Sequence, residues 1–180
     1  MLCDTKSKMP VLRDFQPEVL EDAAELSDVP SILIRQAIGD MWVVMKNPDV
    51  QFHGGVWCSV QGPSDMFPDR LPQCQICLAG AVMLRRLPTE MLDRMICWPG
   101  SFPANVPEKL AALDDLRTGN VRGFLNTVPG WTAPTKHFWG EFKFCPPLFS
   151  LPDGPVSKQV TETWRKDADA VADWLQKYDC

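Results

Sequence analysis

The chain has 180 residues, of which 45% are hydrophobic and 23% charged, and its formal net charge is −5 at pH 7. A chain of this length can bury one self-supporting core, so it needs neither a disulfide framework nor a structural metal to fold. The negative charge argues against nucleic-acid binding over the whole surface, because Lys and Arg make most phosphate contacts. The opening residues lack the apolar core of a signal peptide, and no run is long enough to cross a bilayer, which predicts a cytoplasmic protein without membrane contact.

We predict one domain over residues 1–180, with residues 1–28 as an acidic N-terminal appendage. No basic residue stands between Arg13 and Arg35, whereas acidic residues recur throughout that interval. Such a run is typical of a solvated helix surface, and alternatively of a face that meets a basic partner. The acidic residues that we assign as candidate partner contacts are Glu18, Glu21, Asp22 and Glu25.

Helical periodicity dominates the first half of the chain. Pro17 begins a short acidic helix, and Pro30 opens a stronger amphipathic helix that Asn47 and Pro48 end. Residues 48–72 are rich in Gly and Pro, which predicts a long loop with one short strand at residues 55–60. The length of this loop marks it as a candidate for function.

Residues 73–87 are apolar on nearly all sides and predict the central helix of the fold. Ala79, Gly80 and Ala81 remove side-chain bulk from this helix. A glycine inside a helix costs about 1 kcal/mol relative to alanine, so we expect another backbone to approach closely at Gly80.

The second half of the chain alternates short helices with irregular segments. Apolar spacing predicts a brief helix within residues 89–96, a clearer one from Asn105 to Gly119 and one more turn at residues 121–125. Residues 138–144 permit a strand, and residues 153–180 carry an amphipathic C-terminal helix. The predicted fold class is therefore a mostly α, compact helical domain with a central small-residue helix, long irregular loops and at most a small β element.

Seven cysteines without regular spacing indicate reduced thiols. Cys74 and Cys77 form a Cys-x-x-Cys pair, which suggests a zinc site, a redox pair or a thiol nucleophile. Further ligands or a catalytic base would have to come from Cys58, Cys97, Cys145, His53 or His137. Because a second pair is missing, we predict buried, unreactive thiols and no catalytic residue, metal or cofactor. A thiol- or zinc-dependent small enzyme is the alternative.

The aromatic segment at residues 131–149 is the strongest binding candidate in the sequence. Its rings can anchor a protein partner, since buried aromatic residues dominate binding energies. With Lys136 and Lys143 the same rings can stack on bases, which is the nucleic-acid-binding alternative. The rings can also simply close the core over the central helix. The candidate contacts in this segment are Trp131, His137, Trp139 and Phe142.

Three stretches of the chain stand out together. They are Trp57 with its Gly- and Pro-rich surroundings, the run Cys-Gln-Ile-Cys-Leu-Ala-Gly-Ala-Val-Met at residues 74–83, and Leu-Ala-Ala-Leu-Asp-Asp-Leu-Arg-Thr-Gly at residues 110–119. In this order they resemble a group of small uncharacterised proteins of tailed phages and prophages. The resemblance covers about residues 54–125. It implies a phage-type accessory protein, without enzymatic activity, that binds a host protein in the host cytoplasm and inhibits a host process or defence system.

Overall fold

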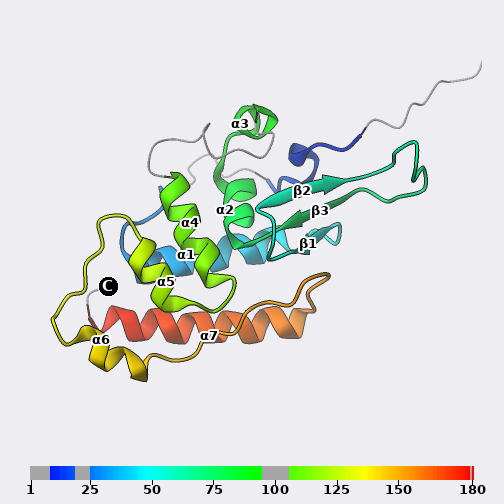
Figure 1. The fold of residues 1–180 in the computed structure, drawn as a ribbon. Helices are drawn as coiled ribbons and strands as arrows, with labels where there is room; N and C mark the ends of the chain where they lie inside the picture. The colour runs from blue at the N-terminus through cyan, green and yellow to red at the C-terminus, as the bar shows by residue number, and fades with distance from the viewer. Residues whose placement is uncertain (1–8, 19–24, 95–105, 179) are drawn as a thin grey trace, which may run out of the picture.

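The computed structural model of the chain describes residues 9–18, 25–94, 106–178 and 180 (Figure 1). This part of the chain is mostly helical with a small three-stranded mixed sheet, which confirms the predicted fold class. The helical elements are η1 (Leu12–Phe15), α1 (Pro30–Val44), α2 (Leu78–Arg86), α3 (Thr89–Arg94), α4 (Val106–Leu116), α5 (Val121–Thr127), α6 (Phe138–Glu141), η3 (Phe142–Phe144) and α7 (Lys158–Gln176). The strands are β1 (Val50–Phe52), β2 (Cys58–Gln61) and β3 (Gln73–Ile76).

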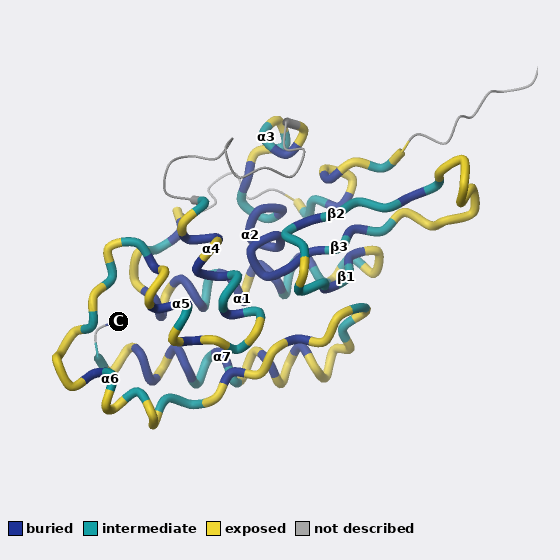
Figure 2. The backbone as a smooth tube through the Cα atoms, viewed as in Figure 1, coloured by how far each residue is buried: buried dark blue, intermediate teal, exposed yellow. Residues whose placement is uncertain are grey.

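Helix α2 is the central element of the fold. It packs against α1 and α4, and every residue from Leu78 to Leu84 is buried (Figure 2). Its small side chains allow both neighbouring helices to come close, and the basic pair Arg85 and Arg86 complements the negative pole of its last turn. The buried apolar residues around it form one hydrophobic cluster that also includes residues of α1, α4, α5 and α7.

The predicted helix over residues 73–87 is wrong at its start. Residues 73–76 form the strand β3, and Cys77 is the N-cap residue of α2. Cys74 and Ile76 point into the core, while Gln73 and Gln75 are half-buried, which is the two-residue alternation of a strand. The apolar helix that follows hid this alternation in the sequence.

Strand β3 lies in the middle of the sheet. It pairs with β1 in parallel, with Val50 opposite Cys74, and with β2 in antiparallel orientation, with Val60 opposite the same residue. The predicted strand at 55–60 corresponds to β2, and the predicted loop 48–72 therefore contains two strands. Between β2 and β3 the chain runs out into a long loop that projects from the body of the molecule (Figure 1).

The carbonyl oxygen of Trp57 joins the sheet to the central helix. It accepts a hydrogen bond of 3.3 Å from the backbone N–H of Cys77. A Cβ atom at Gly80 would lie 1.7 Å from this oxygen, a distance that no side chain can tolerate. The expected close approach of a backbone at Gly80 is therefore confirmed, and the approaching group is the carbonyl that precedes β2.

Helix α7 packs along α1, and its amphipathic pattern confirms the predicted C-terminal helix. Trp164, Ala168, Val171 and Leu175 are buried, whereas Val160 in the first turn is exposed. The described residues contain no helix with the length and hydropathy that crossing a bilayer requires.

One further sequence prediction needs correction, and two predicted helices lie partly outside the described residues. Residues 138–144 form α6 and η3 rather than a strand, because Phe138 and Phe142 are one helical turn apart and both rings contact Trp174 of α7. The acidic helix predicted from Pro17 lies largely outside the described residues, as does the end of the brief helix that begins with α3.

Two cations, the half-buried Arg86 and the buried Lys109, tie separate elements together. Arg86 of α2 pairs with Asp40 of α1 at 2.5 Å, and burial raises the pKa of the Asp40 carboxyl in spite of this partner. Lys109 of α4 is buried and donates to the carbonyl of Leu26 at 2.6 Å and to the carboxylate of Asp28 at 2.8 Å. Since an unpaired buried charge is strongly unfavourable, these contacts fix α1 and the segment before it on the central helices.

Replacing Gly80 by alanine should lower the free energy of unfolding by about 3 kcal/mol or more, because the new methyl group forces the Trp57 carbonyl away from α2. Gly39 in α1 is the matched control, since a Cβ there meets nothing within 4 Å. The substitution Gly39→Ala should raise the stability by up to about 1 kcal/mol. Urea denaturation of both variants measures the two effects, and equal stability of Gly80→Ala and the parent would contradict the close contact.

Candidate interaction surfaces

The Cys-x-x-Cys pair is built into the core. Cys74 lies on β3 and Cys77 at the N-terminus of α2, and neither thiol has any exposed surface. Burial raises the pKa of Cys74 to about 12. Burial also raises the pKa of Cys77 to about 11, although the N–H groups of Gly80 and Ala79 favour its thiolate. A protonated, enclosed thiol is a poor nucleophile, so this geometry does not support thiol catalysis.

The contacts that the described part of the chain gives for the two histidines are structural, and Cys97, a candidate partner, lies outside the described residues. His53 follows β1, and its Nδ1 atom accepts a hydrogen bond of 3.0 Å from the N–H of Gly55, which stabilises the turn. His137 is the exposed N-cap residue of α6 and makes no side-chain capping bond. Within the described ranges, no three His, Cys, Asp or Glu side chains gather in an arrangement that could hold a metal ion.

Most of the aromatic side chains in this segment pack against one another and against α7. Phe138 is fully buried and contacts the rings of Trp131 and Trp139 at centroid distances of 5.5 and 5.2 Å. Phe142 and Trp174 continue the cluster at 5.8 Å. Edge-to-face ring contacts of this kind stabilise a fold by about 0.5–1.5 kcal/mol each. Three of the predicted contact residues are thus half-buried members of a cluster that covers the C-terminal half of α7.

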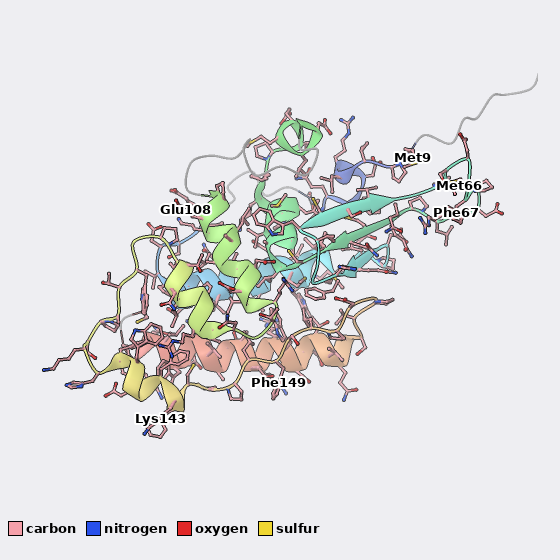
Figure 3. The ribbon with its side chains drawn as sticks, viewed as in Figure 1. Met9, Met66, Phe67, Glu108, Lys143 and Phe149 are labelled. Atoms are coloured by element: carbon pink, nitrogen blue, oxygen red, sulfur yellow. The ribbon has the colours of Figure 1, made fainter. Side chains whose placement is uncertain are left out.

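Part of this segment remains available to a partner: Trp131 lines a pocket of about 570 Å³, and the residues at the outer edge of the segment are exposed. Phe144 and Phe149 are exposed, and the ammonium group of Lys143 lies 4.9 Å from the centroid of the Phe144 ring. His137 is exposed at the start of α6. Figure 3 shows Lys143 and Phe149 on the α6 and α7 side of the molecule, away from the sheet.

The acidic candidates are only partly described. Glu18 and Glu25 are exposed, whereas Glu21 and Asp22 lie outside the described residues. The backbone carbonyl of Glu18 accepts a hydrogen bond from Arg85, and that of Glu25 accepts one of 3.2 Å from Gln36. The backbone at these two positions is therefore fixed on α2 and α1, and the carboxylates stay in solvent.

Among the described residues, the two most exposed large apolar side chains, Met66 and Leu71, lie on the loop between β2 and β3, which we call the tip loop (residues 62–72). Met66 is 81% exposed, Phe67 53% and Leu71 73%. Figure 2 shows the tip loop as an exposed extension, and Figure 3 places Met66 and Phe67 at its end. Large apolar groups that gather on one projecting segment indicate an interaction site more often than scattered ones do.

The tip loop has a defined conformation. The N–H of Phe67 donates to the carbonyl of Ser64 at 3.0 Å, and the N–H of Ser64 donates back to the carbonyl of Phe67 at 3.1 Å. The N–H of Arg70 donates to the same Phe67 carbonyl, and its guanidinium lies 5.1 Å from the centroid of the Phe67 ring. An ordered loop loses little conformational entropy when it binds.

The N-terminal segment supports the base of the tip loop. A Cβ at Gly62 would lie 2.4 Å from Cδ of Pro10, so the two residues are in direct contact. Pro10 is flanked by the exposed side chains of Met9 and Val11, which extend the apolar surface. The sequence marked the whole loop by its length, but it did not single out these residues, because exposure is a property of the folded chain.

Comparisons of the chain with protein-family models, curated proteins and solved structures find no match.

Alkylation by iodoacetamide at pH 8 should separate the two core thiols from accessible ones. Raising a thiol pKa from 9.0 to about 12 lowers the thiolate fraction of Cys74 at this pH by a factor of about 1000. We expect Cys74 and Cys77 to react at least about 100-fold more slowly in the folded protein than in urea, measured peptide by peptide with mass spectrometry. Reaction of Cys77 in the folded protein within about tenfold of its rate in urea would contradict its burial.

Proposed function

We propose that this chain is a binding protein that recognises a protein partner through the tip loop. The observation that carries the proposal is the exposure of Met66, Phe67 and Leu71 on an ordered, projecting segment, while most large apolar side chains pack into one core. Burying one such side chain contributes about 1.5–3 kcal/mol, so three together supply most of the free energy of a micromolar complex.

The charges of the tip loop indicate the chemistry of the partner. Asp65 and Asp69 flank the apolar residues, the guanidinium of Arg70 is engaged over Phe67, and the whole chain carries −5. These charges favour an apolar pocket rimmed by Lys or Arg, because such a rim attracts the loop and fixes its orientation. They disfavour nucleic acid and anionic lipid as partners at this surface, since phosphate groups repel carboxylates.

The resemblance to phage and prophage proteins suggests a host protein as the partner and inhibition of a host process as the outcome. A cytoplasmic site of action agrees with the free thiols of Cys74, Cys77 and Cys145. In this proposal the aromatic cluster supports α7, while the exposed acidic residues Glu18 and Glu25 add to the negative field that guides a basic partner.

Serine substitution of Met66, Phe67 and Leu71 together should weaken partner binding at least about 100-fold and leave the melting temperature unchanged, because these side chains lie outside the core. The matched control is Phe144→Ser with Phe149→Ser, which removes exposed aromatic rings elsewhere. Both variants and the parent would be immobilised, exposed to bacterial lysate and cross-linked, and mass spectrometry would map the cross-links on the retained protein.

The proposal predicts a protein with an apolar, Lys- or Arg-rimmed surface that is retained by the parent and the control, lost by the tip variant, and cross-linked to residues 62–72. If the tip variant still retained this protein, or if the control lost it, the binding surface would lie outside the tip loop and the proposal would be wrong. Absence of any specifically retained protein would contradict the proposal.

A further inference from the structure

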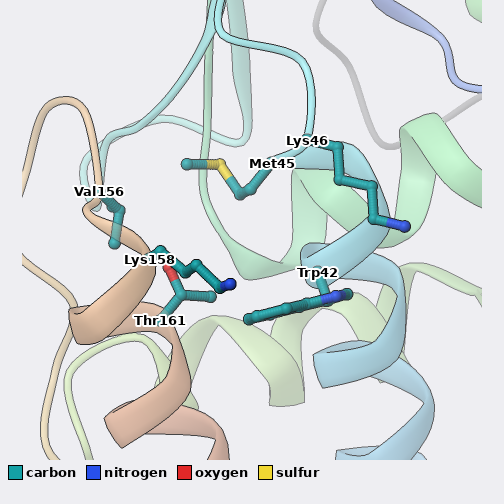
Figure 4. Close-up of a pocket in the computed structure, with 6 residues that line it drawn as sticks. All are labelled: Trp42, Met45, Lys46, Val156, Lys158 and Thr161. Atoms are coloured by element: carbon teal, nitrogen blue, oxygen red, sulfur yellow. The ribbon is translucent and has the colours of Figure 1, made fainter.

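A pocket of about 280 Å³ lies between the end of α1 and the start of α7. We call it the Trp42 pocket. It is lined by Trp42, Met45, Lys46, Val156, Lys158 and Thr161 (Figure 4). Its volume is close to the lower limit of about 300 Å³ that is typical of small-ligand sites.

One wall of the pocket is flat and apolar. Trp42 is half-buried, and the side chains of Met45 and Val156 complete the apolar lining. The guanidinium of Arg165 lies 5.5 Å from the centroid of the Trp42 ring without lining the pocket, so it helps to hold the ring in place. A held indole ring is a good surface for stacking another flat ring.

The other lining groups are cationic or hydrogen-bonding. Figure 4 shows Lys158 extended toward the Trp42 ring, while Lys46 stands at the rim with its ammonium turned outward. The ammonium group of Lys158 lies 3.8 Å from a carboxylate oxygen of Glu162, which makes a long and weak ion pair. No carboxylate of the described residues lies within ion-pair distance of Lys46. Both lysines are exposed and flexible, so each ammonium can move onto an anion that enters the pocket.

The start of α7 adds to the positive potential. Lys158 is the first residue of this long helix, and Thr161 lies in its first turn with its hydroxyl donating to the carbonyl of Ser157 at 3.1 Å. The N-terminal pole of a helix favours negative charge. The C-terminal end of α1 on the other side of the pocket has the opposite polarity, so the attraction for an anion rests on the two ammonium groups, that of Lys46 after α1 and that of Lys158 in α7.

We propose that the Trp42 pocket binds a nucleoside monophosphate. The base stacks on the Trp42 ring, and Lys46 and Lys158 pair with the phosphate. A purely apolar ligand leaves both cations unused, and inorganic phosphate leaves the ring unused. The inference is independent of the tip loop, because none of the residues that line the Trp42 pocket lies within residues 62–72.

Calorimetric titration of the full chain with adenosine 5′-monophosphate tests this inference. We expect a dissociation constant of about 0.1 mM or lower, and binding of inorganic phosphate at least about tenfold weaker. Lys46→Gln with Lys158→Gln should weaken nucleotide binding at least about tenfold, since each phosphate contact is lost. The matched control, Lys166→Gln with Lys177→Gln, removes two exposed lysines of the same C-terminal region and should change nothing.

The indole N–H signal of Trp42 in a ¹⁵N spectrum, identified with the Trp42→Phe variant, should shift during the titration.

A 5′-phosphorylated tetranucleotide distinguishes the source of the ligand: weaker binding than the monophosphate assigns the pocket to free nucleotides, as we expect. Tighter binding that still depends on Lys46 and Lys158 would overturn that assignment in favour of a nucleic-acid end. Absence of binding at about 10 mM nucleotide, a concentration roughly 100-fold above the expected dissociation constant, would overturn the site itself. Binding that the double lysine variant leaves intact would overturn it as well.

Discussion

The contact between the carbonyl of Trp57 and Gly80 positions the rest of the molecule. It brings the chain before β2 onto the first turn of α2, and the same oxygen receives the N–H of Cys77 at the junction of strand and helix. Only glycine permits this approach. Because α2 is small-sided, α1 and α4 can pack directly on it, and α7 then covers α1. The thiols of Cys74 and Cys77 are enclosed as a consequence of this packing, which is why their pKa values are raised.

Helices with a strong apolar periodicity could be predicted from the sequence, whereas short strands could not. The limits of α1 and α4 follow from apolar spacing and from Pro and Gly near their ends, whereas the range 153–180 predicted for the last helix includes five non-helical residues before Lys158. Strand β3 was missed because four residues give only two alternations, and an apolar helix follows directly. The sequence also predicted a close approach at Gly80, but not by which backbone, since the partner Trp57 comes from a distant segment. The strand suggested at 138–144 failed for the same reason: Trp174 on α7 selects the helical arrangement of Phe138 and Phe142.

The candidate surfaces differ in how far the sequence could reveal them. Buried, unreactive thiols were predictable from the missing second pair of ligands. The exposed residues of the tip loop could not be predicted, because Met66 and Leu71 are apolar residues of the same types that are buried in the core elsewhere in the chain. The Trp42 pocket depends on the packing of α1 against α7, two elements at opposite ends of the sequence. A densely packed centre therefore carries two separate surfaces for which we propose recognition roles, the apolar and acidic tip loop and the aromatic and basic Trp42 pocket.

Native-state hydrogen exchange tests most directly whether the β3–α2 unit is the rigid centre. The backbone amides of Cys77 and of residues 81–84 are bonded within the most deeply buried part of the chain. They should exchange only through global unfolding, so that the free energy derived from their exchange equals the value from urea denaturation. Amides of the tip loop should exchange several orders of magnitude faster. If the α2 amides exchanged through a local opening well below the global free energy, the centre of stability would lie elsewhere and the account would be wrong.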